Sequence, residues 1–197
     1  MSDVHLEPLI ADRIDETADM LARAYMTNPL HVATFGEHEE WRNQAFFRRL
    51  LRTMRGPTVI AFDGNRIVGA VHWSRSSDCQ MRTSEKMLLL PFMLRAFGLR
   101  TSIRLASWFG LWARHDPVDA VHLHLGPMGV DPDARGIRIG GRLMERFCAE
   151  VDRTKTAGYA ETDRQNNIAF YQHFGFEVMK EIEVMGMRNW LMWRAPK

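Results

Sequence analysis

The stretch at residues 126–144, GPMGVDPDARGIRIGGRLM, sets Arg135, Gly136, Arg138, Gly140 and Gly141 between an apolar run and a helix-like pattern. The start of a helix exposes unpaired N–H groups and the positive end of the helix dipole, which suit a phosphate or diphosphate. Glycines let the backbone approach the anion closely, and a nearby Arg adds charged hydrogen bonds. The stretch therefore indicates an anion cradle, with an ordinary turn as the alternative.

Other phosphate-binding motifs fit this stretch poorly. The glycine spacing is not G-x-G-x-x-G, and no Lys-Ser/Thr pair follows the glycines. The sequence therefore argues against a dinucleotide fingerprint and against a P-loop.

Length and composition predict one globular domain. The chain has 197 residues, 46% of them hydrophobic, and a formal net charge of +2, which argues against bulk electrostatic binding of nucleic acid. Cys79 and Cys148 have no metal-binding spacing and are expected to be reduced thiols. The sequence shows neither the pattern of a signal sequence nor that of a transmembrane helix. We therefore predict a cytoplasmic protein with no membrane partner.

Hydrophobic periodicity predicts a mixed α/β domain spanning residues 1–197. Asp63-Gly64 between two β-branched runs indicates a hairpin. Residues 76–118 form a largely helical insertion, whose Leu and aromatic stripe is core packing, a substrate lid or a dimer face. The remaining predicted elements are strands at 4–10, 119–130, 158–163, 176–183 and 187–194, and helices at 14–26, 39–54, 139–155 and 166–174.

Two motifs resemble those of a known family. GPMGVDPDARGIRIGGRLM resembles motif A of the GNAT superfamily of N-acetyltransferases, and ETDRQNNIAFYQHFGFE, at residues 161–177, resembles the second landmark of that superfamily. Length, insertion and the closing NWLMWRAPK are similar to the puromycin N-acetyltransferase-like branch. The resemblance implies an α+β fold with a mixed sheet of about seven strands, flanked by helices and carrying the helical insertion before the motif strand.

One residue departs from the family pattern. Arg138 stands where the pattern has its first motif glycine, whereas the second is kept as Gly140. The long side chain can swing outward to meet a phosphate of coenzyme A, or it can weaken binding of the cofactor.

The resemblance implies acetyl-CoA as co-substrate. The backbone of Met128 and Val130 would pair with the pantetheine arm, and the Met128 N–H would polarise the thioester carbonyl. Asn167 matches a cofactor-side Asn and also fits a helix N-cap. The predicted cofactor-binding residues are Met128, Gly129, Val130, Arg135, Gly136, Ile137, Arg138, Ile139, Gly140, Gly141, Asn167 and Tyr171.

The resemblance also implies catalytic roles. Tyr171 stands where the family places its general acid, although a Tyr simply packed beside Phe170 is the alternative. For the general base, His124, His122 and Glu161 are candidates; the two histidines share a strand face and titrate near neutrality. The remaining histidines lack metal-site spacing, so no metal is expected.

These observations predict an acetyl-CoA-dependent N-acetyltransferase acting on a primary amine of a small molecule, with a homodimer possible. Two alternatives stay open. One is transfer to a peptide or protein amine, or of a longer acyl chain. The other is a catalytically silent acyl-CoA-binding module.

Overall fold

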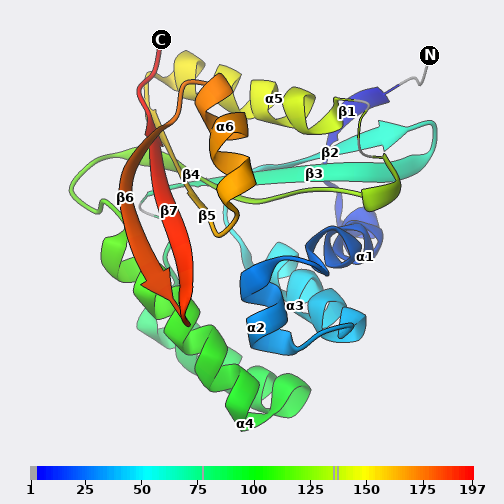
Figure 1. Cartoon of the computed structure of the whole chain (residues 1–197). Coiled ribbons are helices and arrows are strands. Elements are labelled where there is room, and N and C mark those ends of the chain that lie inside the picture. The colour runs from blue at the N-terminus through cyan, green and yellow to red at the C-terminus, as the bar shows by residue number, and fades with distance from the viewer. Residues whose placement is uncertain (1–3, 77, 135, 137) are drawn as a thin grey trace.

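A computed structural model describes residues 4–76, 78–134, 136 and 138–197, and its centre is one mixed sheet (Figure 1). The seven strands have the order β1-β2-β3-β4-β5-β7-β6, and β4–β5 is a parallel pair in an otherwise antiparallel sheet. The strands are β1 (Val4–Pro8), β2 (Thr58–Asp63), β3 (Arg66–Arg75), β4 (His122–Val130), β5 (Ala157–Thr162), β6 (Glu177–Val184) and β7 (Met187–Arg194). The predicted seven-stranded α/β architecture is confirmed.

Helices cover both faces of the sheet. In Figure 1, α5 and α6 lie on one side, and α1, α2, α3 and α4 lie on the other. Their bounds are α1 (Ile14–Tyr25), α2 (Pro29–Phe35), α3 (Glu40–Thr53), α4 (Thr83–His115), α5 (Ile139–Thr154) and α6 (Gln165–His173). None of the helices described is both long and apolar enough to cross a membrane.

Alternation along the strands builds the two-sided core. In β2, Val59 and Ala61 pack into the cluster under α5, whereas Ile60 and Phe62 pack into the cluster under α1 and α3. Successive side chains of a strand point to opposite faces, so the apolar run of β2 supplies both cores. The two-residue turn at Gly64 and Asn65 confirms the predicted hairpin.

The sequence reading missed helix α2. Asn28 has extended backbone and its side chain accepts a hydrogen bond from the His31 N–H at 3.0 Å, and Pro29 occupies the first helical turn. Asn followed by Pro is an N-cap followed by a favoured first helical residue, so this signal was present although it was read only as the end of α1.

The predicted helical insertion is α4, interrupted at Gly98, whose φ of +75° is not helical. Its apolar stripe divides between two roles. Phe97 and Trp108 are buried core residues, whereas Leu90 and Phe109 are 49% and 41% exposed.

Strands β4 and β5 separate part of the way along their length. Their parallel pairing runs from His122 to Leu125 on β4 and ends at Ala160 on β5, although both strands continue. The remainder of β4 stays paired with β3, after a bulge between Leu125 and Met128. Beyond this point, one edge of β4 has no neighbouring strand.

Candidate active site

A cleft of about 660 Å³ lies where β4 and β5 separate. Its walls come from α1, the second half of β4, the start of α5, the end of β5, and α6. Of the predicted site residues, it is lined by Met128, Gly129, Val130, Gly136, Arg138, Ile139, Gly140, Gly141, Glu161, Asn167 and Tyr171. Residues far apart in the sequence therefore meet in one cavity. Arg135 and Ile137, which were also predicted to bind the cofactor, lie outside the described residues.

The start of α5 forms one wall of the cleft. Gly136 has a φ of +91°, a conformation that favours glycine. A Cβ on Gly140 would meet Val130, Met128 and Phe170 at ordinary contact distances of 3.7–3.8 Å. An alanine at position 140 would therefore fit the fold while filling space over the first N–H groups of α5.

Arg138 precedes α5 in a left-handed conformation, with φ 61° and ψ 17°. This conformation costs an L-residue other than Gly, Asn or Asp roughly 1–2 kcal/mol. The backbone thus keeps the shape that the family's glycine would favour, and the exposed Arg138 side chain stands at the cleft.

The open edge of β4 already has a partner from α1. The Tyr25 hydroxyl donates to the Met128 carbonyl at 2.9 Å, and the Met128 N–H donates to the same hydroxyl oxygen at 3.3 Å. Sequence reasoning placed Tyr25 only on the buried face of a helix. Nothing in the local pattern distinguishes it, because its contact lies 103 residues away.

Tyr171 and Asn167 lie on the α6 side of the cleft. Burial raises the pKa of Tyr171, so its hydroxyl stays protonated at neutral pH. The Asn167 side chain donates to the Thr162 hydroxyl at 3.3 Å. The expected N-cap role of Asn167 is wrong, because Arg164 holds that position and Asn167 lies inside the first turn.

His124 is held between carboxylates. Its Nε2 lies 2.7 Å from Glu161 Oε2, and its Nδ1 lies 3.4 Å from Asp116 Oδ2. Burial would lower the pKa of His124, but Glu161, Asp116 and Cys79 together raise it well above its usual value. The ring is thus protonated at neutral pH and does not line the cleft, so this geometry does not favour His124 as a general base.

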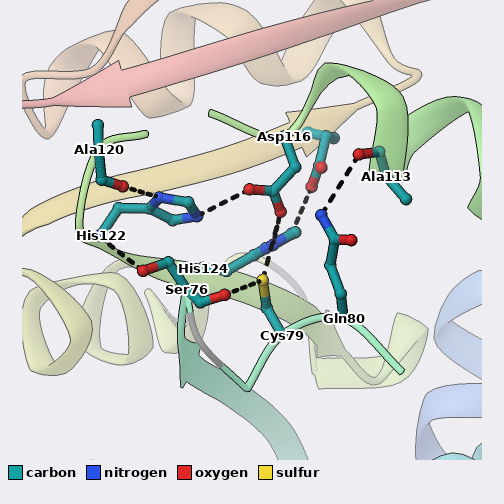
Figure 2. A network of polar contacts seen from close by, with 9 residues as sticks. Ser76, Cys79, Gln80, Ala113, Asp116, Ala120, His122 and His124 are labelled. Carbon is teal, nitrogen blue, oxygen red and sulfur yellow. Dashed lines mark hydrogen bonds and ion pairs between the residues drawn. The ribbon is translucent and has the colours of Figure 1, made fainter. Parts of the chain in front are cut away.

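His122 shares the face of His124 as predicted, since both rings approach Asp116. However, the two rings point toward Asp116 and Cys79 rather than into the cleft (Figure 2). His122 is fully buried, and burial lowers its pKa. Of the three base candidates, Glu161 is the one that lines the cleft, and its Oε1 is buried without a hydrogen-bond partner among the described residues.

Carboxylates and indoles meet on the side of the cleft formed by α2 and α4. Trp108 and Trp112 reach the cleft from α4. Asp163 lines it as well, and is fixed by the Asn28 side chain at 2.7 Å and the Leu30 N–H at 2.8 Å. A pocket with anionic oxygens beside aromatic faces suits a cation.

Comparisons with known proteins agree with this arrangement. Residues 105–178 match the model of the acetyltransferase (GNAT) domain, a range that includes both motifs' central residues. This part of the chain is therefore similar to a GNAT acetyltransferase domain, and the fold agrees with that similarity.

Solved structures share the fold over nearly the whole chain. A structure from Corynebacterium glutamicum titled histone acetyltransferase HPA2 and related acetyltransferase has a TM-score of 0.76 at 20% identity, over 100% of this chain and 98% of that one. Polyamine N-acetyltransferase of Drosophila melanogaster scores 0.64 at 16% identity, over 97% and 98%. Arylalkylamine N-acetyltransferase 2 of Aedes aegypti scores 0.65 at 13% identity, over 99% and 100%.

Proposed function

We propose that this chain transfers an acetyl group from acetyl-CoA to the primary amine of a small molecule. One observation carries the proposal: a single cleft joins the N-terminus of α5, the open edge of β4, the Tyr171 hydroxyl and the unpaired oxygen of Glu161. Two of the solved structures of similar fold, the polyamine and the arylalkylamine N-acetyltransferase, are named for small amine acceptors, which supports such an acceptor here.

The donor end of the cleft fits a thioester carrier. The N–H groups at the start of α5 can bind a diphosphate, because they lack partners within the helix. The open edge of β4 supports an extended pantetheine arm, because β5 has left the backbone there unpaired. Tyr25 must release the Met128 N–H before that group can stabilise an oxyanion.

The acceptor end supplies the proton chemistry. In this proposal Glu161, which lines the cleft, accepts a proton from the ammonium group, so that the neutral amine can attack the thioester carbonyl. The carbon–sulfur bond then breaks, Tyr171 gives its proton to the leaving thiolate, and the surplus proton on the new amide nitrogen returns to the Tyr171 oxygen. Asp163 and the indoles of Trp108 and Trp112 would hold the acceptor's cationic body.

The test is an acceptor screen with purified protein and acetyl-CoA. Thiol release is measured against a panel of monoamines, diamines, arylalkylamines and short peptides, and the acetylated product is identified by mass. We expect amine-dependent release with at least one small amine. Acetyl-CoA binding without release by any acceptor would instead indicate a silent binding module, and release with peptides alone would indicate a peptide acetyltransferase.

A further inference from the structure

Four metal-ligating side chains converge outside the cleft. They are Cys79 in the turn after β3, Asp116 at the C-cap of α4, and His122 and His124 at the start of β4 (Figure 2). One ligand atom from each lies within 4.8 Å of all the others. We propose that this cluster is a structural zinc site.

The distances from the two histidines to Asp116 suit a tetrahedral ion better than direct hydrogen bonding, whereas the Cys79 thiol donates a hydrogen bond to Asp116 Oδ2. Asp116 carboxylate oxygens lie 3.3 Å from Cys79 Sγ, 3.4 Å from His124 Nδ1 and 3.5 Å from His122 Nε2. Zinc bonds of about 2.0–2.3 Å in tetrahedral geometry separate neighbouring ligands by about 3.3–3.8 Å. Charge-assisted N–H···O hydrogen bonds would be shorter, at about 2.7–2.9 Å.

The atoms that would bind the ion are also those left without hydrogen bonds. His122 Nε2, His124 Nδ1 and Asp116 Oδ1 are buried and have no hydrogen-bond partner among the described residues. The His122 and Asp116 side chains are 0% and 3% exposed. Buried polar atoms are ordinarily hydrogen-bonded, so three buried atoms that face one another and are joined only by ion-pair contacts of 3.4–3.5 Å favour a shared metal ion.

Each histidine is oriented from its other nitrogen. His122 Nδ1 lies 2.8 Å from the Ala120 carbonyl oxygen, and His124 Nε2 lies 2.7 Å from Glu161 Oε2. A carbonyl or carboxylate accepting the second ring N–H fixes the tautomer of a metal-bound histidine and directs the other nitrogen at the ion. The cluster thus supplies the ligand atoms and also the groups that orient the two histidine rings.

The donor set and its charge select zinc. One thiolate, two neutral imidazoles and one carboxylate compensate a divalent cation, and these are ligands that Zn²⁺ takes in four-coordinate structural sites. The prediction of no metal rests on the spacing of histidines and cysteines within the sequence. It does not consider ligands that the fold brings together from three separate segments. An ion here would connect both ends of the α4 insertion to β4, and would lie one residue away from Glu161 through the His124 ring.

The direct test uses the untagged full chain, stripped with a chelator and titrated with ZnCl₂ by calorimetry. We expect one zinc per chain and a higher thermal midpoint in its presence. CoCl₂ should give the absorption of a tetrahedral cobalt site together with a thiolate-to-cobalt charge-transfer band, which reports a cysteine ligand without any mutation. Absence of stoichiometric zinc binding, or a cobalt complex lacking the thiolate band, overturns the proposal.

Variants assign the site. Cys79→Ser and His122→Gln should each weaken zinc binding more than about 100-fold, a larger loss than the 10–100-fold typical of outer-contact changes. The matched control is Cys148→Ser, since Cys148 is the other free thiol and lies outside the cluster; it should bind zinc as the parent does. Unchanged zinc affinity in Cys79→Ser, or equal loss in Cys148→Ser, refutes the assignment.

Discussion

The two halves of β4 differ in what their backbone leaves free. From His122 to Leu125 the strand is paired with both β3 and β5, so only side chains are available for chemistry, and these form the cluster around Asp116. From Gly126 to Val130 the strand has lost β5, and its open edge faces the cleft. One strand thus supports a buried side-chain site and a backbone-lined site, according to where its neighbour departs.

The largest effect should come from a change in the cleft beside the open half of β4. Tyr171→Phe removes the proposed acid and should lower kcat at least about 100-fold, the contribution typical of general acid–base catalysis. Acetyl-CoA binding, measured by calorimetry, should change less than about twofold, because the hydroxyl has no hydrogen-bond partner among the described residues. Unchanged turnover would remove Tyr171 from the mechanism.

A buried histidine outside β4, His31, sharpens the contrast between charged and neutral histidines. His31 is buried beside Asn43, with no carboxylate in contact, and burial lowers its pKa to about 4. Arg164 lowers it further, whereas the Asn43 hydrogen bond opposes the shift. His31 is therefore neutral in the folded protein at neutral pH, unlike His124.

This difference predicts a pH dependence of stability. Because the unfolded His31 takes up a proton near pH 6.5 and the folded one near pH 4, its contribution is intact above pH 6.5 and falls by about 3 kcal/mol between pH 6.5 and 4. Urea unfolding across this range measures the slope. His31→Gln should make the slope shallower whatever its effect on absolute stability; an unchanged slope would contradict the assignment. Burial also lowers the pKa of His72, to about 4, and that of His122, so both add to the remaining slope.

A substitution at Gly140 separates the effect on anion binding from the effect on the stability of the fold. Gly140→Ala should leave the thermal midpoint nearly unchanged, since the added Cβ meets only ordinary contacts. It should weaken acetyl-CoA binding about tenfold, because hydrogen bonds to a charged group contribute about 1.5–3 kcal/mol and the methyl group holds the diphosphate away. Gly110→Ala, where a Cβ meets nothing within 4 Å, is the control and should bind normally.

A substitution at Tyr25 tests whether its hydroxyl competes with the cofactor for the open edge of β4. Tyr25→Phe removes both hydrogen bonds to Met128 and should lower stability by about 1 kcal/mol. The same change should tighten acetyl-CoA binding about fivefold, because the cofactor no longer displaces the hydroxyl. Weaker binding in Tyr25→Phe would mean that the hydroxyl helps the cofactor.

Sequence reasoning succeeded where the signal was local. Alternation located β2 and β3, and Gly64 with Asn65 located their turn. Gly136, Gly140 and Gly141 lie in a wall of the cleft, while their cofactor-binding role stays a prediction.

It failed where distant segments decide the outcome. The alternation of His122 and His124 gave their shared face, but not the burial and carboxylates on that face, which come from α4 and β5. The Tyr25 contact to Met128 and the approach of Cys79 to Asp116 likewise depend on tertiary packing. No pattern within a short window encodes these contacts.

The smallest expected effect concerns Arg138. Arg138→Gly removes the cost of a left-handed conformation at a residue with a side chain, roughly 1–2 kcal/mol. It also adds conformational freedom to the unfolded chain, which lowers the stability of the fold by roughly 0.4–1 kcal/mol. Stability should therefore rise by no more than about 1.6 kcal/mol, as urea unfolding can measure. The acetyl-CoA affinity then decides the role of the side chain: we expect about threefold weaker binding at low salt and a smaller difference at high salt, since an exposed charge is screened. Tighter binding in Arg138→Gly would instead show that the arginine obstructs the cradle.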